Sequence, residues 1–122
     1  MQDPNCIFCK IVRGEIPSRK VYEDEAIFAF HDIHPVAPVH VLIVPKVHVP
    51  TMMEVEETHK DVLGAMMLAA PRIARELGST DGFRLIVNSG RVGRQEVMHV
   101  HMHVVGGPEP LGPMIARARQ PG

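Results

Sequence analysis

The chain has 122 residues and is 45% hydrophobic, which is enough for one ordinary domain with a buried core. Its formal net charge is −1, with both signs scattered along the chain, so no surface for nucleic acid or an anionic membrane is predicted. No apolar stretch approaches the roughly 20 residues of a membrane span, and the start lacks a secretory signal pattern. We therefore expect a cytoplasmic protein without a membrane partner.

The first third of the chain predicts a short helix and a hairpin. Asn5 is a candidate N-cap for a helix over residues 6–13, and Gly14 is a typical stop. Residues 21–23 and 26–31 are rich in β-branched and aromatic side chains and are separated by an acidic turn. These two segments are expected to pair as strands.

The middle of the chain predicts one strand and one long helix. Residues 39–44 follow a loop bounded by prolines and form the strand. Over residues 54–77, apolar side chains recur at spacings of three, four and seven, which is typical of an amphipathic helix, and Gly78 ends it. Pro71 removes an internal hydrogen bond, so we expect a kink there or two shorter helices.

The last third predicts two more strands, over residues 83–88 and 97–105, joined by a polar loop. Short connections favour antiparallel pairing, with the long helix across one face of the sheet. The expected fold class is therefore α+β. Residues 107–122 are rich in Pro, Gly and Arg and are expected to run over the surface or across a partner.

Three histidines occupy alternate positions of the last predicted strand: His99, His101 and His103. On an extended strand they share one face, while the apolar residues between them face a core. Three interpretations remain open. The row is a half-exposed strand without a function, a metal centre, or a site of covalent catalysis in which one imidazole attacks phosphorus.

Cys6 and Cys9 are the two cysteines of the chain, too few for a secreted disulfide scaffold. On a helix this spacing places both thiols on one face. A metal site, a redox pair and two buried thiols are all compatible with the pattern.

Taken in order, these segments resemble the histidine triad family, in its branch of small purine nucleoside phosphoramidase-like proteins. The ending Leu111-Gly-Pro-Met114 is similar to bacterial members in particular. The motifs that carry the resemblance are Ile7-Phe8-x-Lys10-Ile11, Glu15-Ile16-Pro17, Ala29-Phe30-His31-Asp32-Ile33, Pro38-Val-His40, Val44-Pro45-Lys46-Val-His48, Val87-Asn88 and His99-x-His101-x-His103-Val-Val-Gly-Gly107.

The resemblance implies a fold and an activity. Residues 1–122 are expected to form one domain, a five-stranded antiparallel sheet with one long and one short helix, and two copies to join their sheets as a homodimer. The implied activity is hydrolysis of nucleoside 5′-phosphoramidates or related nucleotidyl conjugates through a nucleotidyl-histidine, which releases a purine nucleoside monophosphate. Two alternatives are a nucleotide-binding regulatory protein with negligible turnover and a metalloenzyme that uses the triad on a metal.

The resemblance also assigns roles to residues. His101 is the implied nucleophile, His103 contacts a phosphate oxygen or the leaving group, and His40 belongs to the proton relay. Glu96 stands where many animal members have a phosphate-binding serine, and Arg94 replaces a common glycine. The implied nucleotide-binding residues are Ile7, Phe8, Ile11, Ile16, Phe30 and Ile33 for the base, Asp32 for the ribose, and Asn88, Arg94, Gln95, Glu96, His101 and His103 for the phosphate.

The resemblance also implies two further ligands beside the cysteine pair. Cys6, Cys9, His48 and His99 would complete a tetrahedral set of two thiolates and two imidazoles without an open position, which is typical of structural zinc. We expect one zinc ion per chain. It would tie the N-terminal helix to the histidine strand.

Overall fold

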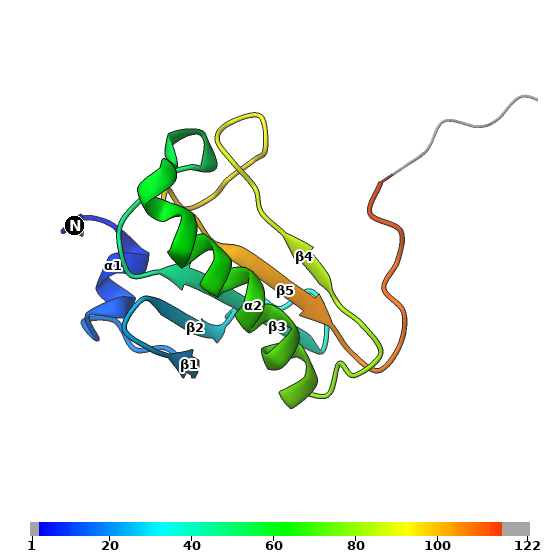
Figure 1. The fold of residues 1–122 in the computed structure, drawn as a ribbon. Helices are drawn as coiled ribbons and strands as arrows, with labels where there is room; N and C mark the ends of the chain where they lie inside the picture. The colour runs from blue at the N-terminus through cyan, green and yellow to red at the C-terminus, as the bar shows by residue number, and fades with distance from the viewer. Residues whose placement is uncertain (1–2, 116–122) are drawn as a thin grey trace, which may run out of the picture.

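The computed structural model describes residues 3–115 and has an α+β fold, as predicted (Figure 1). Within this range the strands form one five-stranded antiparallel sheet in the order β1-β2-β3-β5-β4. The helices and strands are α1 (Ile7–Val12), β1 (Lys20–Glu23), β2 (Ile27–His31), β3 (Val39–Pro45), the 3-10 turns η1 (Met52–Glu54) and η2 (Glu57–His59), α2 (Lys60–Glu76), β4 (Arg84–Ile86) and β5 (Met102–Gly106).

The two helices cover opposite faces of the sheet, and strand alternation decides which side chains each face receives. Figure 1 shows α2 lying across one face. On β3, Val41 and Ile43 belong to the core under α2, whereas Leu42 and Val44 pack with α1. His40 is two residues before Leu42 and shares its face, so the His40 imidazole lies on the α1 side of the sheet. This face carries the chemistry.

The short helix begins one residue later than predicted. Cys6, and not Asn5, is its N-cap, since the Cys6 backbone is extended and its Sγ accepts the Cys9 N–H. Arg13 is the C-cap, and Gly14 follows with a φ of 81°. The left-handed conformation explains why glycine stands at this position.

The long helix is shorter at its start than predicted and is continuous at Pro71. Residues 52–59 form two 3-10 turns, and the α-helix begins only at Lys60. The expectation of two shorter helices is wrong, because α2 runs through Pro71 to Glu76. Ile73 and its buried neighbours hold this segment on the sheet. The carbonyl that loses its donor belongs to Met67, which lies on the exposed side of the helix.

The histidine strand is also shorter than predicted, since β5 spans Met102–Gly106 and not residues 97–105. Before Met102 the chain leaves the ladder: the His99 N–H donates to the Val97 carbonyl, and the Val100 N–H donates to Val49. The strand over residues 83–88 contracts to β4 for the same reason, since only Arg84 to Ile86 find partners on β5.

The predicted tail is described only in part. Residues 107–115 form neither helix nor strand, and Arg84 Nη2 donates to the Gly112 carbonyl at 2.8 Å. Residues 116–122 lie outside the described range. Between residues 3 and 115, none of the helices combines the length and the apolar character that crossing a bilayer would require.

Candidate functional site

The three histidine rings line one face, as the alternation predicted, although only His103 lies in the regular part of β5. The ring centroids of His101 and His103 are 5.0 Å apart. Phe8 of α1 packs edge-on against His99 and His101, with centroids 6.0 and 5.1 Å away. The short helix therefore fixes the row from the opposite side.

His101 is held with a free lone pair. Its Nδ1 lies 2.7 Å from the His99 carbonyl, which can only accept, so Nδ1 carries the hydrogen and Nε2 does not. The side chain is buried and lines a cavity. Burial lowers the pKa of His101 below that of an exposed imidazole, which keeps the ring neutral at physiological pH. A neutral imidazole with a bare Nε2 is a nucleophile.

His40 and His103 form a directed hydrogen-bonded pair. The Val36 N–H donates to His40 Nδ1 at 3.1 Å, so the hydrogen of neutral His40 is on Nε2. This Nε2–H donates to His103 Nδ1 at 2.9 Å, with a carboxylate oxygen of Asp32 3.4 Å away. His103 consequently carries its hydrogen on Nε2. The pair can pass a proton without changing its position.

The same tautomers argue against a metal ion at this pair. Asp32, His40 and His103 bring three potential ligand atoms within 4.8 Å of one another. However, His40 Nε2 carries a hydrogen and Nδ1 accepts from Val36, so neutral His40 has no lone pair left for an ion. The tautomer of neutral His40 therefore argues against an ion held jointly by Asp32, His40 and His103.

A cavity of about 300 Å³ lies between α1, the end of β2 and the histidine row. It brings together most of the residues predicted to bind a nucleotide. Its walls are largely apolar, and its polar lining includes histidines, Asn88 and two acidic residues, Asp32 and Glu96. The predicted residues that line it are Ile7, Phe8, Ile11, Ile16, Phe30, Asp32, Ile33, Asn88, Glu96, His101 and His103.

Two predicted residues do not line the cavity. Gln95 instead secures its own loop, because its amide nitrogen donates to the Pro50 and Val97 carbonyls and its Oε1 accepts the Gly90 N–H. Arg94 is exposed, with a φ of 59° that is unusual outside glycine. Glycine adopts a left-handed backbone of this kind more readily than any other residue.

The cavity also contains residues that the sequence alone did not reveal: Pro17, Ser18, His31, Leu42 and Val97. Leu42 could have been found, since it is two residues from His40 on β3, shares its face of the sheet and pairs with His103. Pro17 and Ser18 reach the cavity where the chain returns after α1, His31 ends β2, and Val97 lies before β5. No local spacing marks these positions.

The predicted metal ligands come together at the His99 end of the histidine row. Their ligand atoms lie within 4.8 Å of one another, and the residues are Cys6, Cys9, His48 and His99. His99 Nδ1 lies 3.3 and 3.5 Å from the two sulfurs, and His48 Nδ1 lies 3.2 Å from His99 Nδ1 and 3.5 Å from Cys9 Sγ. His99 Nε2 donates to the Pro45 carbonyl at 2.8 Å, which leaves Nδ1 as a lone pair aimed at the cluster.

These distances fit the tetrahedral coordination of a zinc ion. Zinc bonds of about 2.3 Å to sulfur and about 2.0 Å to nitrogen place the ligand atoms roughly 3.3–3.8 Å apart. Burial lowers the pKa of His99 to about 4 and raises the pKa of the Cys9 thiol. The imidazole is therefore ready to bind a cation, and a divalent ion would displace the thiol protons.

Comparison with known proteins identifies the family. A sequence model of the HIT domain matches residues 13–109, which include His40 and the complete histidine row. The chain belongs to the HIT domain family. This confirms the resemblance to the histidine triad family seen in the sequence.

Several HIT domain proteins are similar over most of their length. A purine nucleoside phosphoramidase of Escherichia coli K12 is 51% identical over 111 residues, covering 90% of this chain and 92% of the relative. A 14 kDa zinc-binding protein of Zea mays is 44% identical over 109 residues, or 88% and 85% of the two chains. The structure of a histidine triad protein from Clostridium difficile superimposes with a TM-score of 0.87 at 43% identity, covering 93% of this chain and all of that one.

The burial of His103 predicts a folded state that loses stability in mild acid. Burial, together with the neighbouring His101 and His40 rings, lowers the pKa of His103 from 6.5 to about 4. Between these values the unfolded chain binds a proton that the folded chain does not, so the free energy of unfolding decreases as the pH falls. In His103→Gln this contribution is gone, and the urea midpoint should fall less between about pH 7 and pH 5 than in the wild type.

The exposed His34 offers a control. His34→Gln retains His103 and should show the pH dependence of the wild type. The same fall of the midpoint in all three proteins would contradict the assignment.

Proposed function

We propose that this HIT domain hydrolyses nucleoside 5′-phosphoramidates or related nucleotidyl conjugates and releases a purine nucleoside monophosphate. The observation that carries the proposal is the bare Nε2 of His101 beside a cavity of nucleotide size, with the Nε2–H of His103 next to it. The similarity to a purine nucleoside phosphoramidase supports the same substrate class. Residues 1–122 are proposed to act as one domain.

The first step forms a bond from His101 Nε2 to the α-phosphorus and breaks the bond from phosphorus to the leaving nitrogen. The leaving nitrogen takes the hydrogen of His103 Nε2 and departs as a neutral amine, while the Nε2–H of His40 donates to His103 Nδ1 and stabilises the electron pair left on that ring. The His101 ring becomes positively charged as it bonds to phosphorus, and the Asp32 carboxylate stabilises that charge. The product of this step is a nucleotidyl-histidine and a neutral amine.

The second step reverses the proton flow. Water attacks the phosphorus and gives its proton back to His103 Nε2, while the phosphorus–nitrogen bond to His101 breaks. The Nδ1–H of His101 keeps its hydrogen bond to the His99 carbonyl through both steps, so Nε2 is again bare at the end. The division into two displacements makes each of them easier than direct attack by water.

The remaining cavity residues are proposed to hold the nucleotide. Asn88, which faces the cavity near the histidines, would donate to a phosphate oxygen, and the apolar wall around Phe8 and Phe30 would receive the purine. Asp32 is proposed to accept from the ribose hydroxyls. Glu96 would repel a bare phosphate, so its role is assigned to the leaving-group side.

Replacing the nucleophile tests this function. His101→Asn keeps a polar side chain but lacks the attacking nitrogen, so AMP release from adenosine phosphoramidate should fall by at least about a thousandfold. Rates are measured by chromatography of released AMP. His59→Asn, at the end of η2 and away from the cavity lining, is the control and should retain the wild-type rate.

Two outcomes would count against the proposal. Equal AMP release by the wild type and His101→Asn would exclude His101 as the nucleophile. Tight AMP binding by calorimetry without turnover of several phosphoramidates would favour the regulatory, nucleotide-binding alternative.

We propose in addition that Cys6, Cys9, His48 and His99 hold a structural zinc ion. The convergence of the four ligand atoms and the similarity to a zinc-binding protein of Zea mays support it. The ion would supply a fixed cross-link and no reactive ligand, because all four positions are filled by protein. The His99 ring then holds the carbonyl to which His101 Nδ1–H donates. Two free cysteines also suit a reducing, cytoplasmic compartment.

Removing the thiols tests this cross-link. In the double variant Cys6→Ser with Cys9→Ser, metal analysis should show loss of one zinc per chain, and the melting temperature should fall because α1 loses its tie to the histidine row. We expect kcat to fall as well, since the His99 carbonyl is no longer fixed. Full zinc content in the double variant would contradict the proposed ligand set.

A homodimer is proposed through the free edge of β4, which is an outermost strand of the sheet. An unpaired edge presents N–H and C=O groups that a second copy can satisfy, and the half-exposed Val87 and Phe83 flank it. Sedimentation equilibrium should give about 27 kDa, twice the chain mass of 13.5 kDa. Val87→Lys should lower this mass, whereas Glu25→Lys, on the β1 side, should not. A wild-type monomer would refute the proposal.

A further inference from the structure

Asp3 lies beside the thiol and imidazole cluster and contacts it through its backbone. Its N–H donates to Cys9 Sγ at 3.4 Å, and its carbonyl accepts the Cys6 N–H at 3.2 Å. A thiolate gains from such N–H donation, because the donor partly neutralises its charge.

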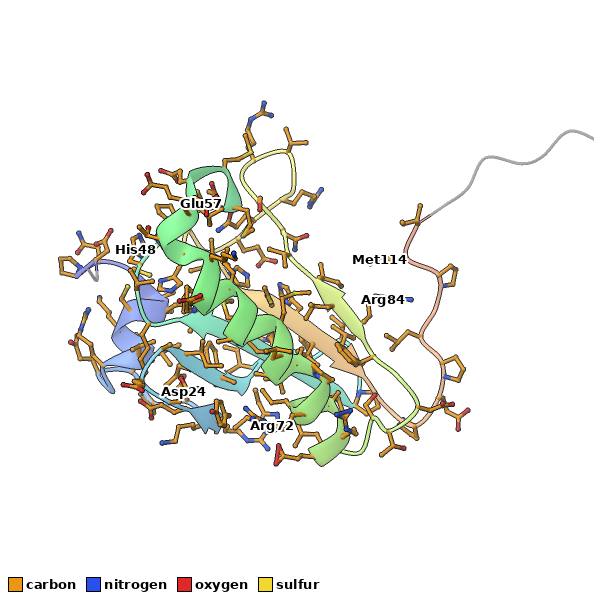
Figure 2. All side chains as sticks on the ribbon, viewed as in Figure 1. Asp24, His48, Glu57, Arg72, Arg84 and Met114 are labelled. Atoms are coloured by element: carbon orange, nitrogen blue, oxygen red, sulfur yellow. The ribbon has the colours of Figure 1, made fainter. Side chains whose placement is uncertain are left out.

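The Asp3 carboxylate faces the outer nitrogen of His48. His48 Nδ1 points into the cluster, which leaves Nε2 on the outside, and Asp3 Oδ2 is 3.9 Å from it. The other carboxylate oxygen accepts the Asn5 N–H at 2.8 Å, so the carboxylate has a fixed direction. Figure 2 shows His48 close to the N-terminal segment that contains Asp3.

The two imidazoles of the cluster therefore have different outer partners. His99 Nε2 donates to the neutral carbonyl of Pro45 in the interior. His48 Nε2 has a carboxylate as its neighbour, at the wall of a cavity of about 420 Å³ that Asp3, Cys6 and His48 share. An imidazole that binds a cation becomes a better N–H donor, so a carboxylate at this nitrogen stabilises the bound form more than the free form.

We propose that Asp3 is a positioning residue of the metal centre. Its carboxylate, 3.9 Å from His48 Nε2, favours the tautomer that leaves Nδ1 free for the ion, and its negative charge stabilises the ring once a cation is bound. The inference rests on the zinc site proposed above and adds a residue from outside the ligand set and outside the matched HIT domain, which begins at residue 13.

The charge of the Asp3 carboxylate can be tested separately from its hydrogen bond to the Asn5 N–H. Asp3→Asn keeps an oxygen that can accept the Asn5 N–H and removes only the charge, whereas Asp3→Ala removes both. The zinc dissociation constant of the full chain is measured by competition with a chromophoric chelator. We expect affinity to fall by about tenfold in Asp3→Asn and by more in Asp3→Ala. Asp81→Asn, in the turn between α2 and β4, removes the same charge elsewhere and should bind zinc as the wild type does.

Two further measurements separate positioning from folding. The metal-free Asp3→Asn chain should unfold at the wild-type urea concentration. Its cobalt derivative should keep the absorption of a site with two thiolates and two imidazoles, because the four ligands are unchanged.

Zinc affinities of Asp3→Asn and Asp81→Asn within about twofold of each other would overturn the role of Asp3 and leave the zinc site standing. Absence of zinc uptake by the wild-type chain would overturn both, and the metal analysis of the cysteine variants would already reveal it.

Discussion

The hydrogen bond from His101 Nδ1–H to the His99 carbonyl is the interaction on which the rest of the site depends. It assigns the tautomer of His101 and leaves Nε2 bare toward the cavity. The same residue that accepts this bond turns its own ring to the cysteines. His99 therefore links the cysteines to His101, and a displacement of His99 would move the carbonyl that orients the His101 ring.

Backbone groups fix the tautomers of His99 and His40. Pro45 fixes His99 and Val36 fixes His40, in both cases through the backbone. Backbone groups cannot titrate, so the tautomers they impose do not change with pH. His103 alone takes its tautomer from another ring, and this makes it the position at which a proton can be exchanged.

The matched HIT domain contains the sheet, the histidine row and two of the four residues of the thiol and imidazole cluster, His48 and His99. The matched domain begins at residue 13, after both cysteines and all of α1. The N-terminal helix nevertheless supplies Phe8 to the cavity and both sulfurs to the cluster. A segment outside the matched region thus completes the cavity beside the histidine row.

The sequence by itself determined the strands, the two helices and the shared face of the three histidines, because hydrophobic alternation and helical spacing are local patterns. It also contained the family motifs that paired Cys6 and Cys9 with His48 and His99. Only the tertiary structure decided where β5 begins, that Gln95 secures a loop instead of lining the cavity, and that Asp3 faces His48. These features depend on partners distant in the chain. The direction of each imidazole hydrogen likewise follows from a carbonyl or N–H that folding brings beside the ring, and no local spacing encodes it.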